Sequence, residues 1–152
     1  MALGLLNLEI APVRGNAALL SNQPILHTCI VSASEESTLV PGDVVALATG
    51  GADDKIVVKK AAVTDLPIGV VVGCGAVKTG FKAGDHISVF PANSYVYMST
   101  GAANIARGSK LQFQADGDVV ATSTASNGYI GVAYTKGVAS GDVIIVHVEP
   151  SI

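Results

Sequence analysis

Apolar and polar residues alternate in short runs along most of this chain, and turn-forming residues separate one run from the next. From residue 25 onwards each run is rich in Val, Ile, Tyr or Phe and is bounded by Gly, Pro, Asn, Asp or Ser, a pattern typical of β-strands. The pattern predicts strands at residues 25–31, 44–48, 55–60, 68–72, 86–90, 95–98, 110–114, 119–122, 129–133 and 143–148.

Short strands at this spacing predict a single small all-β domain, an antiparallel β-sandwich or barrel in a jelly-roll or tulip-like arrangement. The pair Asp116-Gly117 marks the clearest hairpin, because it accepts the positive φ of a tight turn and alternating residues flank it. Residues 100–107 offer at most one loose helical turn, since Gly101 lies among them. The chain is therefore expected to consist of strands and turns.

The first 24 residues have a different pattern from the rest. Leu6, Leu8 and Ile10 alternate with polar residues, as in a half-buried strand, and a turn-rich stretch with Pro12 follows. We interpret residues 1–24 as an extended N-terminal arm that does not fold back wholly onto a β-domain formed by residues 25–152. The alternative is that this segment is an ordinary first strand.

A turn followed by a strand recurs three times, and in each copy Gly precedes Asp and two strand residues follow. Glycine permits a left-handed turn, and the Asp carboxylate accepts hydrogen bonds from nearby backbone N–H groups. We therefore assign these acids a structural role in turns, rather than a metal-binding or catalytic one. The positions are Gly42 and Asp43, Gly84 and Asp85, and Gly141 and Asp142.

A second unit recurs as Ile-Gly-Val at residues 68–70 and 130–132. In both copies a glycine-containing loop and then a Gly-Asp pair follow this strand. The intervals differ by a few residues, as loop insertions would make them. The chain thus contains an internal near-repeat.

The composition points to contact with another protein. Charged residues make up 14% of the chain, against about a quarter in an ordinary soluble domain, and the mean hydropathy is +0.51. A surface this poor in charge leaves apolar area that usually marks an interaction site. The net charge of −3 and the single adjacent basic pair, Lys59-Lys60, argue against direct nucleic-acid binding.

The N-terminus lacks a basic region before its apolar residues, so we expect no secretory signal. The longest apolar stretch, residues 68–77, is too short and too rich in glycine to span a bilayer. Neither export nor a membrane partner is therefore expected.

Few residues offer chemistry. Cys29 and Cys74 are expected to be buried free thiols, with a disulfide between them as the alternative. His147 and Glu149 share one strand face, but a metal site needs three or four ligands, so we expect neither a metal nor another cofactor. No nucleophile motif occurs, and the glycine-containing loop at residues 73–78 has no following helix to bind phosphate. No catalytic residue is assigned.

Several blocks from about residue 38 to the end, taken in order, resemble the capsid decoration (cement) proteins of tailed phages. The blocks are residues 41–45, 66–71, 83–85, 105–111, 116–117, 130–133 and 141–146. The resemblance implies a small non-enzymatic β-domain on the outer surface of the virion, made in the host cytoplasm. It implies the major capsid protein as partner and a homo-oligomer, with a trimer favoured.

In that setting the arm is expected to contact neighbouring shell subunits by strand addition or apolar packing, and Arg14 to pair with an acidic site there. The predicted arm contacts are Leu3, Leu5, Leu6, Leu8, Ile10, Val13 and Arg14.

Two other functions stay open at this point. A head-fibre or adhesin module that binds host surface glycans needs exposed aromatic side chains, and Tyr95 and Tyr97 lie on the same face of one predicted strand. An enzyme on a trimeric β scaffold is the third alternative.

Overall fold

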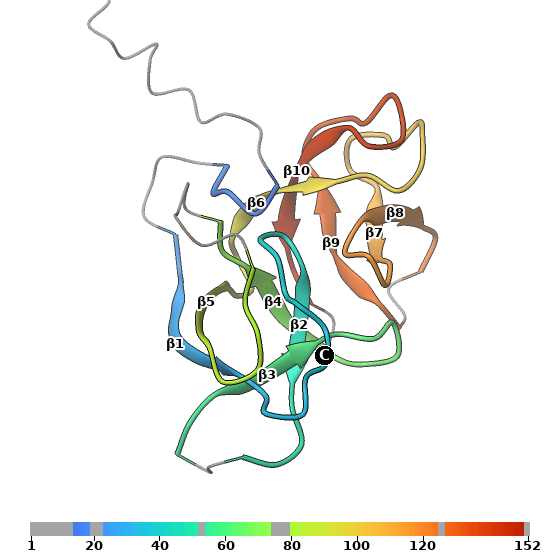
Figure 1. The fold of residues 1–152 in the computed structure, drawn as a ribbon. Helices are drawn as coiled ribbons and strands as arrows, with labels where there is room; N and C mark the ends of the chain where they lie inside the picture. Colours follow the sequence, from blue (N-terminus) through green and yellow to red (C-terminus); the bar gives the residue numbers. More distant parts are fainter. Residues whose placement is uncertain (1–13, 19–22, 52–53, 74–79, 125–126, 151–152) are drawn as a thin grey trace, which may run out of the picture.

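The computed structural model describes residues 14–18, 23–51, 54–73, 80–124 and 127–150, which contain ten strands and no helix (Figure 1). The strands are β1 (Leu26–Val31), β2 (Val44–Leu47), β3 (Val57–Lys60), β4 (Pro67–Val71), β5 (His86–Phe90), β6 (Tyr95–Ser99), β7 (Lys110–Phe113), β8 (Val119–Thr122), β9 (Tyr129–Ala133) and β10 (Val143–Val148). The all-β prediction is thereby confirmed. No helix among these residues is long and apolar enough to cross a membrane.

The strands form two groups. β1 to β5 close into a barrel in the order β1-β3-β2-β4-β5, and β6 to β10 form a sheet in the order β6-β10-β9-β7-β8. All pairs are antiparallel except β1 with β3, which run parallel. This parallel pair is the exception to the antiparallel arrangement that the sequence predicted, and it closes the barrel. We call β1–β5 the first unit and β6–β10 the second unit.

The two units have the same topology. The first unit, read as β3-β2-β4-β5-β1, matches the second, read as β8-β7-β9-β10-β6, strand for strand. The registers match as well, since Val45 pairs with Gly69 in the first unit and Leu111 with Gly131 in the second, each just before a register shift. The near-repeat in the sequence is therefore one part of a complete structural repeat.

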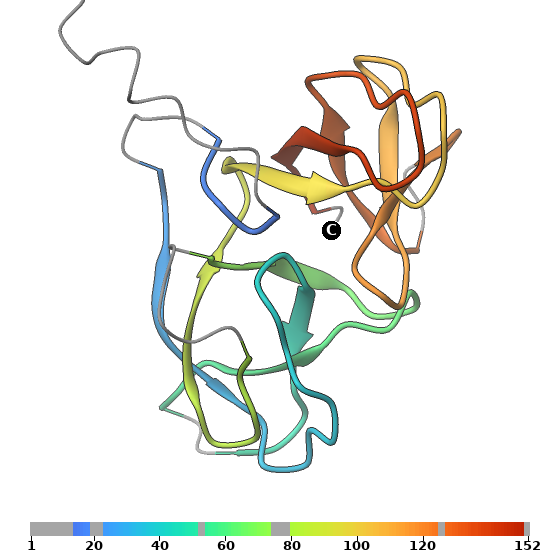
Figure 2. The same ribbon diagram turned by 45° about the horizontal axis from the view of Figure 1, so that its top comes forward.

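The second unit also repeats the closure of the barrel, in a reduced form. A parallel bridge joins Thr100 to Val119, at the position where Val31 pairs with Val58 in the first unit. The backbone N–H that follows each bridge repeats too, since Ser32 donates to Val58 O at 2.8 Å and Gly101 to Val119 O at 2.9 Å. Figure 2 shows the two units side by side.

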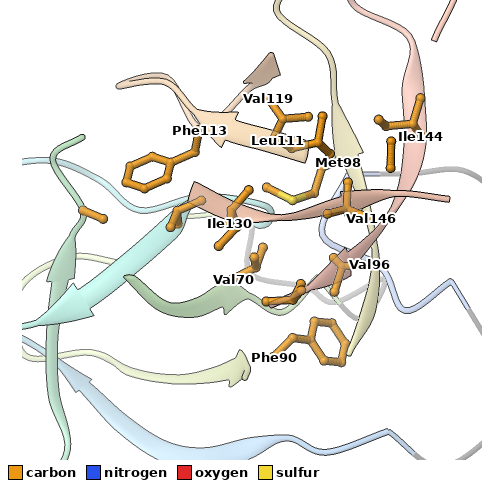
Figure 3. Packing of buried hydrophobic residues seen from close by; sticks show 14 of the residues in the cluster. Val70, Phe90, Val96, Met98, Leu111, Phe113, Val119, Ile130, Ile144 and Val146 are labelled. Carbon is orange, nitrogen blue, oxygen red and sulfur yellow. The ribbon is translucent and has the colours of Figure 1, made fainter. Parts of the chain in front are cut away.

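Two apolar clusters stabilise this arrangement. One fills the barrel and includes Val45, Val58 and Val71. The other fills the second unit and extends to the outer face of the first, so that both faces of β2 and β4 are buried. Figure 3 shows Val70 and Phe90 of the first unit beside residues of the second. A shared core explains why the two units lie against each other.

Candidate functional site

Residues with reactive side chains are dispersed. Within the described ranges, no three His, Cys, Asp or Glu side chains come together as a metal site. Cys29 is a free thiol inside the barrel, and burial raises its pKa, as expected for a structural cysteine. Cys74 lies outside the described residues. His147 Nδ1 lies 2.7 Å from Glu149 Oε1, so these two side chains pair with each other.

The three Gly-Asp pairs form the same turn. Each Asp donates its backbone N–H to the carbonyl three residues earlier, and its carboxylate accepts from the N–H of that same residue. The glycine before it has a φ of +83° to +91°, which favours glycine strongly. A strand begins directly after each Asp, at Val44, His86 and Val143.

Two further turns of this kind were not predicted from the sequence. Asp65 makes the same reciprocal bonds with Ala62, although no glycine precedes it. Ser109 takes the place of Asp after Gly108, which has a φ of +84°, and donates its N–H to Ala106 O. The shared feature is a carboxylate or hydroxyl residue one or two positions before a strand, and this signal is too common in sequences to be decisive.

Asp43 differs from the other turn acids because it is fully buried and paired with cations. Its Oδ1 lies 2.8 Å from Arg14 Nη2, and its Oδ2 lies 3.5 Å from Lys60 Nζ. Arg14 Nη2 also donates to the carbonyl of Asp116, at the tip of the β7–β8 hairpin, at 2.9 Å. This network joins the N-terminal segment, the first unit and the second unit at one point.

Within the chain the charge of Arg14 is paired with Asp43. The expectation that Arg14 pairs with an acidic site on a shell subunit stays a prediction. The residues that follow Arg14 pair with the edge of β6, since Gly15 N–H donates to Tyr97 O and Ala18 N–H to Tyr95 O, both at 2.8 Å. The other predicted arm contacts, Leu3, Leu5, Leu6, Leu8, Ile10 and Val13, lie outside the described residues.

An aromatic cluster lies on the outer face of the second unit, away from its core. Tyr95 stacks on His147 with ring centroids 4.6 Å apart, and Tyr134 contacts the Tyr95 ring edge to face at 5.0 Å. Tyr134 is 46% exposed. A hydrogen bond and an electrostatic interaction with Tyr95, together with the charge of Glu149, raise the pKa of Tyr134. The sequence indicated Tyr95, but cross-strand pairing brought His147 and Tyr134 to it.

Large exposed apolar side chains gather at one end of the first unit. Leu47 ends β2, Ile56 precedes β3 and Leu66 precedes β4, and each is well exposed. Leu47 and Leu66 are neighbours because they follow and precede the cross-strand pair of Ala46 with Pro67. We call these three residues the Leu47 surface.

No protein-family model matches this chain, and no curated protein is similar to it in sequence. Among solved structures, the crystal structure of the N base of head fiber gp8.5 of bacteriophage phi29 matches with a TM-score of 0.58. Its fold is similar to that of a phage head-fibre base. The match covers 83% of this chain and 95% of that chain, at 22% sequence identity.

The match extends over both units. Neither the first nor the second unit makes up 83% of the chain, so strands of both must take part in it. The head-fibre base therefore shares the paired arrangement of units as well as the strands within one unit. This likeness shows a common fold.

Proposed function

We propose that this protein is a structural component of a tailed-phage head, which binds the outer surface of the icosahedral shell and cements neighbouring major capsid subunits. The observation that carries the proposal is the fold shared with a head-fibre base over 95% of that chain. The resemblance of the sequence blocks to decoration proteins supports it independently. The protein acts by binding in this proposal, and no catalytic residue is assigned to it.

Cementing follows from binding equilibrium. A protein that binds the assembled shell but not its dissociated subunits stabilises the shell by RT ln(1 + [L]/Kd) at each site, about 2.7 kcal/mol when free protein is at 100 times Kd. A homotrimer at a junction between capsomers would multiply this effect, because the second and third contacts form at high effective concentration. A trimer is therefore part of the proposal.

The arm supplies additional contacts in this proposal. Arg14 and the β6 pairing that follows it fix the place where residues 1–13 join the domain. Apolar residues of that segment would then add to a shell subunit by strand pairing or apolar packing. Deleting residues 1–13 while keeping Arg14 tests this idea, since the deletion leaves the described core complete. We expect weaker shell binding, and unchanged binding would remove the arm from the proposal.

The direct test mixes purified protein with undecorated, expanded shells. Sedimentation measures the copies bound, and calorimetry measures the melting temperature of the shell. Saturable binding at a fixed ratio to capsid subunits, with a higher melting temperature, is the expected result. Absence of binding would overturn the proposal.

The base of a head fibre that binds host glycans is a second candidate function. The specific observation in its favour is the aromatic cluster of Tyr95, Tyr134 and His147, in which Tyr134 is exposed, next to the half-exposed carboxylate of Glu149. Flat rings with a few polar groups beside them suit the apolar face and the hydroxyls of a sugar. A glycan-binding assay, compared between the wild type and Tyr134→Ala, separates this function from shell binding.

A further inference from the structure

Comparison of the two repeated units shows that the same end is buried in the second unit and exposed in the first. In the second unit that end contains Phe113, which is 1% exposed and belongs to the cluster shared with Val44 and Ala46 of the first unit. The adjoining hairpin contacts the first unit too, because a Cβ on Gly117 would lie 2.8 Å from Asp43 Oδ1. The end of the second unit is therefore seated on the outer face of the first.

The same end of the first unit has no such cover among the described residues. Leu47 is the equivalent of Phe113, since Leu47 pairs with Val58 and Phe113 pairs with Val119. Phe113 is buried, whereas Leu47 is 58% exposed. Ile56 and Leu66 enlarge the exposed apolar area around it. Figure 1 shows the end of β2 pointing away from the second unit.

We propose that the Leu47 surface is the part of the folded domain that docks on the shell, against an apolar face of a capsid subunit. The contact would reproduce, between two proteins, the contact that the second unit makes with the first. This inference rests on the proposed function and names the surface and the partner face that perform it.

The contact between the second unit and the first indicates which side chains the partner face should present. Phe113 shares its cluster with Val44, Ala46 and Ala61, which are small apolar side chains on and beside one sheet face. A capsid subunit that receives Leu47 is expected to present a comparable patch of small apolar side chains. Exposed apolar area of this kind, without charge at its centre, is typical of the core of a protein interface.

A second copy of this chain does not offer such a face. The outer face of its first unit is already covered. The equivalent face of the second unit keeps an apolar residue at Val132, in the place of Val70, but is polar at three other positions. Lys110 and Gln112 take the places of Val44 and Ala46, and His147 takes the place of Phe90. Burying a lysine against leucine without an acidic partner is unfavourable. The capsid subunit is therefore the occupant that the residues favour.

The test compares Leu47→Asp with Val138→Asp in the shell-sedimentation assay. Val138 is 62% exposed in the loop before β10, so it is a matched apolar position outside the Leu47 surface. We expect Leu47→Asp to weaken shell binding at least about tenfold, because a charge replaces a leucine that would be buried. Val138→Asp is expected to bind as the wild type does. Leu47→Ala serves as a milder second variant, with a smaller loss.

Each outcome bears on a different statement. Wild-type protein that does not bind shells overturns both the proposed function and this inference. Wild-type binding that Leu47→Asp leaves unchanged overturns the inference alone, and so does an equal loss in Val138→Asp. If Leu47→Asp instead dissociates an oligomer of the free protein and still binds shells, the occupant is a second copy and the shell assignment is wrong. Melting curves verify that all variants are folded.

Discussion

At the scale of single residues, Asp43 combines a turn with a buried ion pair. Its carboxylate is fully buried, whereas the corresponding hydrogen bonds of Asp85 and Asp142 are exposed. Arg14→Ala removes the closer of its two cations and leaves a buried carboxylate with Lys60 at 3.5 Å. We expect a loss of about 3 kcal/mol in the free energy of unfolding, measured by urea denaturation.

A surface ion pair provides the control for that measurement. Lys59 Nζ lies 3.0 Å from Asp65 Oδ2, with the lysine side chain 39% exposed. Pairs of this kind contribute little because water and salt screen them. Lys59→Ala is therefore expected to cost under about 0.5 kcal/mol. Equal losses in the two variants would contradict the importance of burial at Asp43.

Asp142 makes folding depend on pH. Hydrogen bonds from the backbone N–H groups of Ala139 and Val138 lower its pKa in the folded protein below the value of 3.8 that it has when unfolded. Its contribution to stability is therefore present above pH 3.8 and is lost as the pH falls through the folded pKa. Asp142→Asn should reduce the loss of stability between about pH 5 and about pH 2, measured by urea unfolding. A variant with the wild-type pH profile would contradict this assignment.

At the scale of secondary-structure elements, the sequence predicted the positions of all ten strands to within two residues. This was possible because alternation and turn residues are local features. Three strands are preceded by a Gly-Asp turn, for example at Gly84, so the sequence itself indicated where these strands begin. Residues 100–107 form bends and two isolated β-bridges, at Thr100 and Ile105, rather than a helix, and Gly101 had already argued against a helix there.

The pairing of the strands was not predictable in the same way. The parallel pairing of β1 with β3 and the shared strand order of the two units depend on contacts between residues far apart in sequence. The same reason applies to the candidate sites. Arg14 meets Asp43, 29 residues away, and Tyr134 meets Tyr95 through β10, so local patterns indicated neither contact.

The glycine of the Ile-Gly-Val strand holds two strands close together. A Cβ on Gly131 of β9 would clash with the carbonyl oxygen of His147 on β10, and one on Gly69 of β4 would clash with that of Phe90 on β5. Because the obstacle is backbone, Gly131→Ala is expected to lower the free energy of unfolding by about 3 kcal/mol or more. Thermal or urea unfolding of the purified variant measures the loss.

Gly141→Ala is the control for steric crowding. Gly141 has a φ of +91°, and a Cβ added to it would meet nothing within 4 Å, so alanine there meets conformational strain alone. We expect a loss of about 1–2 kcal/mol. If both variants lost the same amount, close approach of the strands would not be the reason for the glycine in β9.

At the scale of the whole molecule, we expect the shared core to make the two units one folding unit. Phe90 belongs to the first unit, is 2% exposed and lies in the cluster that fills the second unit. Phe90→Ala is expected to cost about 3–5 kcal/mol, and both units should still unfold together.

The chain offers a separate reporter for each unit. All four tyrosines lie in the second unit and there is no Trp, so intrinsic fluorescence follows that unit. Reactivity of the Cys29 thiol in a Cys74→Ser background follows the first unit, since Cys29 is fully buried in the barrel. Coincident transitions support a single cooperative unit. Separate midpoints would show that the units unfold independently.

The polar residues on the outer face of the second unit have a consequence for how molecules could stack. If the outer face of the second unit were complementary to the exposed end of the first unit of another molecule, successive molecules would stack into open fibres. In the first unit, the face that packs against the second unit carries Val44, Ala46 and Phe90. In the second unit, the same positions carry Lys110, Gln112 and His147, so this face is not suited to pack against a third unit. We therefore expect free protein not to polymerise through contacts between this face and the Leu47 surface of a second copy.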